Sequence, residues 1–251
     1  MNVRENEVEI HMQDGVADCV LYLVDDGRHP AVIHYPDGVG TRPSQRQMAR
    51  RVAELGYNVL LPNIYYRTSR PPFFAGKFDF GDEKMRARLT ELTTPLSPAA
   101  MERDAASCID FLAARNEVAE GPMAVVGFCF TGAFAVRTAA ARSDRIAAAA
   151  SFHGGRLATD DPNSPHLQLP RINARLYFGH ARDAASMPSD AIAKLDAALS
   201  AWGGEYASET YNARHGWTVP DSAAYDEAEA ERAFAKLREL LAATLHVPTR
   251  N

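Results

Sequence analysis

The chain has 251 residues, a formal net charge of −5 and a pI near 5.9. This balance argues against a nucleic-acid surface, which would carry clustered basic residues and a high pI, and charge alone points to no other macromolecular partner. Hydrophobic residues make up 46% of the chain and charged residues 24%, as in ordinary globular proteins. No apolar run approaches the length of a membrane span, so no membrane partner is expected.

Length and cysteine content indicate the number of domains and the state of the thiols. Chains of this size with an α/β pattern are routinely single domains, and with no repeat or linker we expect one domain over residues 1–251. The N-terminus is polar and lacks an apolar signal segment, which predicts a cytoplasmic location. Cys19, Cys108 and Cys129 are odd in number and unclustered, so we expect reduced thiols and neither a disulfide framework nor a metal site.

Apolar segments of strand length fill the first quarter of the chain. Residues 7–13 and 17–24 flank the turn signal Asp14-Gly15 and predict an N-terminal antiparallel hairpin. Residues 31–35 and 58–62 are mostly apolar and predict buried strands of a parallel sheet.

The loop after residues 31–35 is rich in glycine. Its sequence, Pro36-Asp37-Gly38-Val39-Gly40, lets the backbone approach a ligand. Asp37 is either a plain turn residue or a site residue, and its place beyond the end of a strand favours the second interpretation. Ser44 is expected to cap the following helix, which ends at Gly56.

Residues 63–97 interrupt the alternation of strand and helix. A segment this long is usually a functional lid or disordered, and five aromatic residues from Tyr65 to Phe78 favour a lid-like excursion that supplies an apolar pocket wall. Tyr65 and Tyr66 are therefore candidate substrate contacts. Arg67 follows them and is either a solvated surface charge or, beside a site, a bidentate partner for a carboxylate.

Strands and helices alternate through the rest of the chain. Ser97-Pro98 matches the preferences of a helix start, and Cys108 falls on the buried face of that helix, whereas Cys19 belongs to the hairpin core. The pattern predicts a doubly wound, mostly parallel sheet with helices on both faces. The remaining expected elements are helices at 82–92, 130–141, 191–202 and 223–245 and strands at 123–126, 146–152, 174–182 and 206–211.

The stretch 122–141 organises the expected site. An apolar strand stops at Gly127, Cys129 follows, and helix-forming residues begin at Phe130. Small residues at Gly127 and Gly132 allow a sharp turn that lifts a nucleophile above the edge of the sheet, with the next amide facing its target. Cys129 is therefore a candidate nucleophile, and the alternative is an ordinary buried cysteine.

Downstream residues favour the nucleophile. Asp183 and His215 each follow a predicted strand, at the edge where open α/β sheets place their sites. The order nucleophile, acid, histidine is the one used by α/β-hydrolases. His153 also follows a strand but precedes the acid, so the order favours His215. His34 and His180 lie within strand patterns and are expected in the core.

With these residues the chain resembles the dienelactone hydrolase family, α/β-hydrolases with a cysteine nucleophile that open cyclic enol lactones. The resemblance covers nearly the whole chain and implies an α/β-hydrolase fold, a Cys129-His215-Asp183 triad and no metal or organic cofactor. It rests on Gly-Phe-Cys-Phe-Thr-Gly at 127–132, Phe-Gly-His-Ala-Arg-Asp at 178–183 and Arg-His-Gly-Trp at 214–217.

The resemblance implies roles for further residues. It matches Asp37 to an acidic residue that contacts the resting nucleophile, and Arg67 to an arginine that binds the substrate carboxylate. The amides of Phe130 and Gly38 are expected to form an oxyanion hole. Trp217, in the histidine motif, is expected to contact the substrate.

Two positions depart from the family pattern. Thr131 replaces an elbow glycine, and Val219 stands where the family's best-known members carry a second substrate-binding arginine. The implied function is hydrolysis of small, anionic lactones or esters through an acyl-cysteine, by a monomer or small homo-oligomer. The alternatives are a general carboxylesterase or thioesterase, and a catalytically silent binding protein of the same fold.

Overall fold

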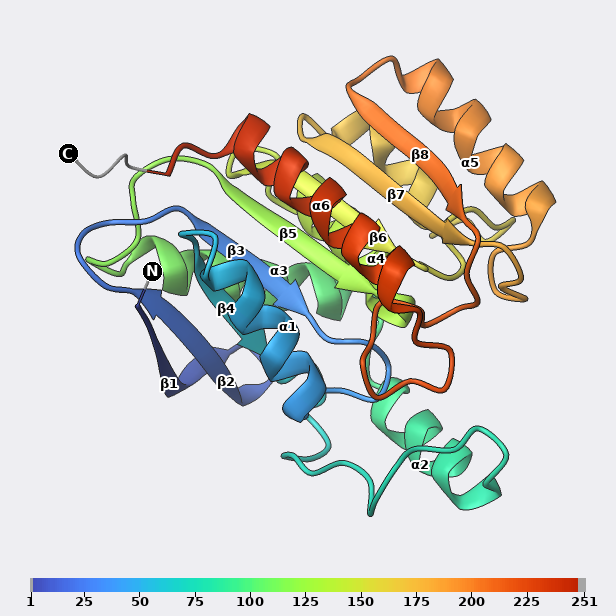
Figure 1. Cartoon of the computed structure of the whole chain (residues 1–251), viewed down its shortest axis with the longest axis horizontal. Helices are drawn as coiled ribbons and strands as arrows, with labels where there is room; N and C mark the ends of the chain where they lie inside the picture. Colours follow the sequence, from blue (N-terminus) through green and yellow to red (C-terminus); the bar gives the residue numbers. More distant parts are fainter. Residues whose placement is uncertain (1, 248–251) are drawn as a thin grey trace.

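The computed structural model describes residues 2–247, in which one eight-stranded sheet has helices on both faces (Figure 1). The strand order is β1-β2-β4-β3-β5-β6-β7-β8. No helix within the described residues has the length and apolarity needed to cross a membrane. The strands are β1 (Val3–Met12), β2 (Gly15–Val24), β3 (Ala31–Tyr35), β4 (Asn58–Pro62), β5 (Met123–Phe128), β6 (Ile146–Phe152), β7 (Arg175–Ala181) and β8 (Tyr206–Tyr211).

The N-terminal hairpin adds antiparallel strands to a parallel sheet. β1 and β2 pair from Val3 opposite Val24 to Met12 opposite Gly15, and Gly15 adopts a φ of 141° that other residues rarely reach. β2 also pairs antiparallel with β4, whereas the pairs from β4–β3 through β7–β8 are parallel. The predicted doubly wound, mostly parallel sheet with an antiparallel hairpin is confirmed.

Helices bury both faces of the central strands. Every residue of β3 and of β5 is buried, which explains their nearly continuous apolar sequences. In Figure 1, α1 and α6 lie on one face and α3 and α4 on the other. Because the central strands are parallel, their carboxyl ends lie at the same edge of the sheet. The helices are α1 (Pro43–Ala53), α2 (Glu83–Thr93), α3 (Pro98–Ala113), α4 (Gly132–Ala141), α5 (Ser189–Trp202) and α6 (Glu227–Thr244).

Helix starts follow local capping chemistry. The Ser97 side chain accepts the Ala100 N–H at 3.2 Å and Pro98 is the first residue of α3, as predicted. The predicted capping role of Ser44 is wrong. Proline fixes a helical φ and suits the first helical position, so α1 already begins at Pro43 and Ser44 lies inside it.

The excursion over residues 63–97 combines irregular chain with α2. Asp82 caps α2 by accepting the amides of Lys84 and Met85. Figure 1 shows α2 and the chain before it extending beyond the edge toward which β5 points. The Phe78 ring makes edge contacts with Phe74 and Phe80, with ring centroids 4.7 Å apart in each pair. The three rings form a partly exposed aromatic cluster within this segment.

Candidate active site

The turn after β5 has the geometry of a nucleophile elbow. A 3-10 turn begins at Cys129 and α4 begins at Gly132. Cys129 has a φ of 57°, a left-handed backbone conformation found at such elbows. A Cβ atom at Gly127 would overlap the backbone of the turn, and one at Gly132 would overlap the Ser151 hydroxyl. The turn therefore depends on both glycines.

Thr131 ties this turn to two strands. Its side chain is fully buried, and its hydroxyl accepts the Phe128 N–H at 3.0 Å. The same oxygen lies 3.0 Å from the Phe128 carbonyl and 3.3 Å from the Tyr35 carbonyl, either of which can accept its proton. Glycine could make none of these hydrogen bonds, so the departure at Thr131 adds a side-chain link between the ends of β3 and β5.

His215 faces Cys129 from the loop after β8. Its Nε2 lies 3.0 Å from the Cys129 Sγ. Asp183, which follows β7, accepts the backbone N–H of His215 at 3.2 Å through Oδ1, and the buried Nδ1 of His215 has no hydrogen-bond partner. The structure thus brings the three residues together, with the carboxylate on the main chain of the histidine and not on its ring.

Electrostatics favour an uncharged thiol and an uncharged imidazole. Burial raises the pKa of the Cys129 thiol to about 11, and the nearby Asp37 carboxylate adds to the rise. Burial lowers the pKa of His215, while the charges of Asp183 and Asp37 oppose that shift. At neutral pH the thiol therefore keeps its proton, and His215 is the neighbouring group placed to accept it.

Two backbone amides face the sulfur. Those of Phe130 and Gly38 hydrogen-bond to Cys129 and lower the pKa of its thiol. The Tyr65 hydroxyl donates to the Gly38 carbonyl at 2.7 Å and holds this loop in place. Gly40, with a φ of 82°, packs so closely on Phe73 that a Cβ atom would come within 2.6 Å of its ring. The loop after β3 is therefore held in place by Tyr65 and Phe73, with its Gly38 amide beside Cys129.

Asp37 is held by an arginine that sequence reasoning missed. Its Oδ1 accepts from Arg42 Nη1 at 2.7 Å and from the Val39 amide at 2.9 Å, and its Oδ2 accepts from Arg42 Nη2 at 2.9 Å. Arg42 also binds Asp221 through Nε at 2.8 Å and Nη2 at 2.9 Å. Both Asp37 oxygens thus accept from Arg42, while the Asp37 carboxylate still raises the pKa of the Cys129 thiol. The expected contact between Asp37 and Cys129 stays a prediction. The proximity of Arg42 to the glycine loop was the available signal.

A cleft of about 620 Å³ opens above Cys129 and His215. Phe130, Val219 and the loop containing Gly38 line one part of it. Phe78, Phe80 and Leu89 of the excursion line another part, which makes that wall apolar. Its charged lining residues are Asp37, Arg42, Lys77, Asp79, Arg214 and Asp221.

Four expected substrate contacts lie outside the lining of this cleft. Arg67 is held by Asp14 and Asp104, each at 2.7 Å, and its side chain is 11% exposed. Tyr66 donates its hydroxyl to Asp104 at 2.8 Å and stacks under Arg67. Tyr65 is buried beneath the Gly38 loop, and Trp217 is fully buried against Tyr211. These positions support the fold around the site, and we do not retain Arg67 as a carboxylate-binding residue.

His153 is part of the cleft after all, although its order in the chain disfavoured it. Its ring meets His215 edge-on, with centroids 5.1 Å apart, and its Nε2 lies 2.8 Å from the Thr218 hydroxyl. Burial lowers the pKa of His153 well below its ordinary value, so the ring remains neutral beside His215. His34 and His180 are buried in strands, as predicted.

The other two cysteines are core residues, as predicted. Cys19 is 2% exposed and Cys108 is 1% exposed, and burial raises the pKa of each thiol. Within residues 2–247, no group of three or more His, Cys, Asp or Glu side chains is arranged to hold a metal ion.

The sheet, the elbow and the histidine loop place this protein in the α/β-hydrolase fold class. The model of the dienelactone hydrolase family matches residues 18–245. The chain belongs to the dienelactone hydrolase family, and family membership makes it a hydrolase.

Curated relatives share about a quarter of their residues with this chain. A candidate carboxymethylenebutenolidase of Synechocystis sp. is 26% identical over 218 residues, which is 85% of this chain and 86% of that protein. The carboxymethylenebutenolidase of Rhodococcus opacus is 28% identical over 155 residues, which is 60% of this chain and 56% of that protein.

Solved structures share the fold. A candidate dienelactone hydrolase from Klebsiella pneumoniae superimposes with a TM-score of 0.85 at 22% identity, over 96% of this chain and 99% of that one. A dienelactone hydrolase-like promiscuous phosphotriesterase from metagenomic libraries gives a TM-score of 0.79 at 20% identity, over 98% and 100% of the two chains.

Proposed function

We propose that this protein hydrolyses small lactones or esters through an acyl-cysteine on Cys129. One observation carries the proposal: His215 Nε2 lies 3.0 Å from the Cys129 Sγ. The amides of Phe130 and Gly38 reach the same sulfur, so nucleophile, base and oxyanion donors converge where a carbonyl would bind.

The reaction follows from these positions. His215 Nε2 takes the thiol proton as the sulfur attacks the carbonyl carbon, and the amides of Phe130 and Gly38 stabilise the oxyanion. The C–O bond then breaks, and the leaving oxygen takes the proton from His215. In a lactone this alcohol stays attached to the acyl group. Water, deprotonated by His215, attacks the thioester and releases the carboxylic acid and the free thiol.

Asp183 supports the charged intermediate. Burial lowers the pKa of His215, and the charge of the Asp183 carboxylate opposes that shift, so Asp183 stabilises the imidazolium that forms when the thiol proton is transferred. Its hydrogen bond to the His215 amide also fixes the loop that carries the ring. We therefore assign Asp183 as the acid of the triad, acting through charge and loop position.

The cleft suits a compact acyl group with a polar end. Phe78, Phe80 and Leu89 offer an apolar wall, and we propose that the excursion they belong to acts as a lid. Arg42 is neutralised by two carboxylates. Within residues 2–247, the Arg214 side chain donates only to the Ala223 carbonyl, at 3.1 Å, and so supplies positive charge for a substrate carboxylate.

A general carboxylesterase or thioesterase is the second candidate. It is favoured by the position of Arg67 outside the cleft lining and by Val219, which leaves that part of the cleft wall apolar. Both features weaken the selection for an anionic substrate. A matched panel of anionic and neutral lactones, esters and thioesters would rank the two candidates by kcat/KM.

The cysteine mechanism can be tested by trapping the intermediate. Wild-type protein is mixed with p-nitrophenyl acetate, and the acetylated peptide is identified by mass spectrometry. We expect an initial burst of p-nitrophenol and an acetyl group on Cys129. Cys129→Ala, which has no nucleophilic side-chain atom, should lose the burst and Cys108→Ala should keep it. A normal burst in a folded Cys129→Ala variant would refute the proposal.

A further inference from the structure

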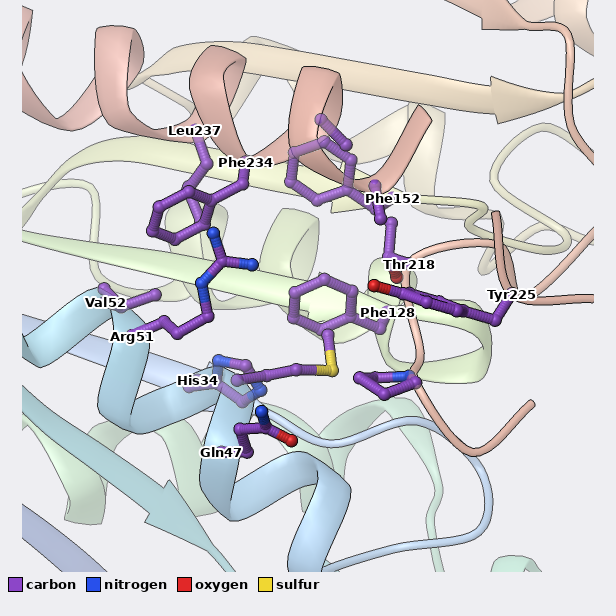
Figure 2. Close-up of a pocket in the computed structure, with 14 residues that line it drawn as sticks. His34, Gln47, Arg51, Val52, Phe128, Phe152, Thr218, Tyr225, Phe234 and Leu237 are labelled. Atoms are coloured by element: carbon purple, nitrogen blue, oxygen red, sulfur yellow. The ribbon is translucent and has the colours of Figure 1, made fainter. Parts of the chain in front are cut away.

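A second pocket lies between α1 and α6, on one face of the sheet. Figure 2 shows Phe234 and Leu237 extending from α6 and Val52 from α1, with Phe128 and Phe152 between them. The pocket holds about 130 Å³ and its walls are mostly apolar and aromatic. An apolar cavity of about 150 Å³ is large enough for benzene, so this volume suits a single small ring.

One wall of the pocket carries an unused polar atom. His34 lines the pocket and is fully buried, and its Nδ1 has no hydrogen-bond partner. Its Nε2 lies 3.1 Å from the Gln45 Oε1, and in this orientation of the Gln45 amide Nε2 bears the proton, while the Gln45 Nε2 is also buried without a partner. Burial lowers the pKa of His34 to about 4, and the neutral ring leaves Nδ1 as an acceptor. A buried acceptor without a donor is costly, and a ligand N–H or O–H group would satisfy it.

The charge at the rim is already neutralised. Arg51 lines the pocket, and its guanidinium stacks on the Phe234 ring at 4.1 Å and binds both oxygens of Glu231, at 2.8 and 2.9 Å. An anionic ligand would therefore find no free cation here, and a cationic ligand would meet an apolar interior that disfavours charge.

We propose that this pocket binds a small uncharged aromatic molecule with one hydroxyl or N–H donor, at a site separate from the catalytic cleft. The apolar walls favour an aromatic ring, and His34 Nδ1 accepts a hydrogen bond from the ligand's donor. Because Arg51 is already paired with Glu231 at the rim, a charged ligand would find no partner there. Neither the hydrolytic reaction nor its nucleophile is needed for this binding.

Two residues that line this pocket also contact or adjoin the proposed catalytic residues. Phe128 lines it and directly precedes the nucleophile. Thr218 also lines it and bonds the His153 ring, which packs on His215. A ligand in the pocket therefore contacts the side chains that support the catalytic histidine without entering the cleft.

Calorimetric titration with phenol tests the proposal. Phenol should bind to wild-type protein, and it should still bind after iodoacetamide has alkylated Cys129. Anisole keeps the ring and oxygen but lacks the donor, so we expect it to bind about threefold to tenfold more weakly. Benzoate, which is charged, should not bind to the alkylated protein.

Filling the pocket supplies the structural control. Ala233→Leu and Ala230→Leu place extra carbons in its lining and should each weaken phenol binding at least tenfold. Ala242→Leu, on the exposed side of α6, should leave it unchanged, and circular dichroism reports which variants fold. The proposal is overturned if phenol binding survives both filling substitutions, disappears on alkylation of Cys129, or is matched by anisole.

Discussion

Replacing Thr131 by valine removes the hydroxyl that ties the elbow and keeps the side-chain volume. The Phe128 N–H, which donates to this hydroxyl at 3.0 Å, would then be buried without an acceptor. Such an orphaned donor costs about 1–3 kcal/mol. For a domain of this size about 2 kcal/mol corresponds to a fall in Tm of about 4–8 °C.

Activity should fall with stability, because Phe128 directly precedes Cys129. A displacement of about 1 Å at reacting atoms can cost about a hundredfold in rate, so we expect kcat/KM for p-nitrophenyl acetate to fall at least tenfold. Thr131→Ser keeps the hydroxyl and should retain most of both properties. Thermal denaturation and steady-state kinetics measure the two effects. If Thr131→Val matches the wild type in Tm and in kcat/KM, the hydroxyl does not hold the elbow.

Three further predictions concern charge and space. Burial lowers the pKa of His215 and the carboxylates oppose that shift, so the acid limb of the kcat/KM profile should lie below pH 6.5. Asp183→Asn removes one opposing charge and should move this limb to lower pH while reducing kcat. A shift of the limb to higher pH would contradict the role assigned to Asp183. Arg214→Met should raise KM for anionic esters about tenfold and leave KM for neutral esters unchanged, as loss of a charge-assisted hydrogen bond predicts. The control Arg67→Met should affect anionic and neutral esters equally. Equal effects of Arg214→Met on both esters would exclude Arg214 as the carboxylate partner. Gly132→Ala should abolish soluble expression, since its Cβ would lie 2.8 Å from the Gly154 Cα, and a folded, active variant would show that the turn can relax.

Much of the fold was predictable because buried parallel strands have short, uniformly apolar sequences. The strands at 31–35, 58–62 and 146–152 have this character and the predicted boundaries. The strand at 206–211 also has the predicted boundaries, although its sequence is mixed and only Tyr211 is buried. The elbow was also predictable, since the apolar run, the glycines and Cys129 all lie within one short stretch of sequence. These signals are local, so a single sequence contains them in full.

The polar partners could not be predicted, because they join distant parts of the chain. Arg42 and Asp221 are 179 positions apart, and Arg67 and Asp104 are 37 apart. A motif placed Arg67 near a strand end, but only the packing of α3 against the hairpin side of the sheet brings Asp104 to it. Sequence reasoning assigned a free charge to a residue whose donors are already occupied.

The left-handed backbone at the ends of β5 and β6 bears on whether this protein is an enzyme. Cys129 and His153 have φ values of 57° and 41°, a conformation that costs a non-glycine residue about 1–2 kcal/mol. Glycine would adopt it without that penalty. A protein selected only for stability or passive binding would gain by losing both side chains, whereas an enzyme accepts a less stable fold to keep a thiol and an imidazole at its reacting centre. Asp26 and Arg156 share this backbone conformation outside the cleft lining, so it is the coincidence of strain with a thiol and an imidazole in the cleft that supports the proposed cysteine chemistry.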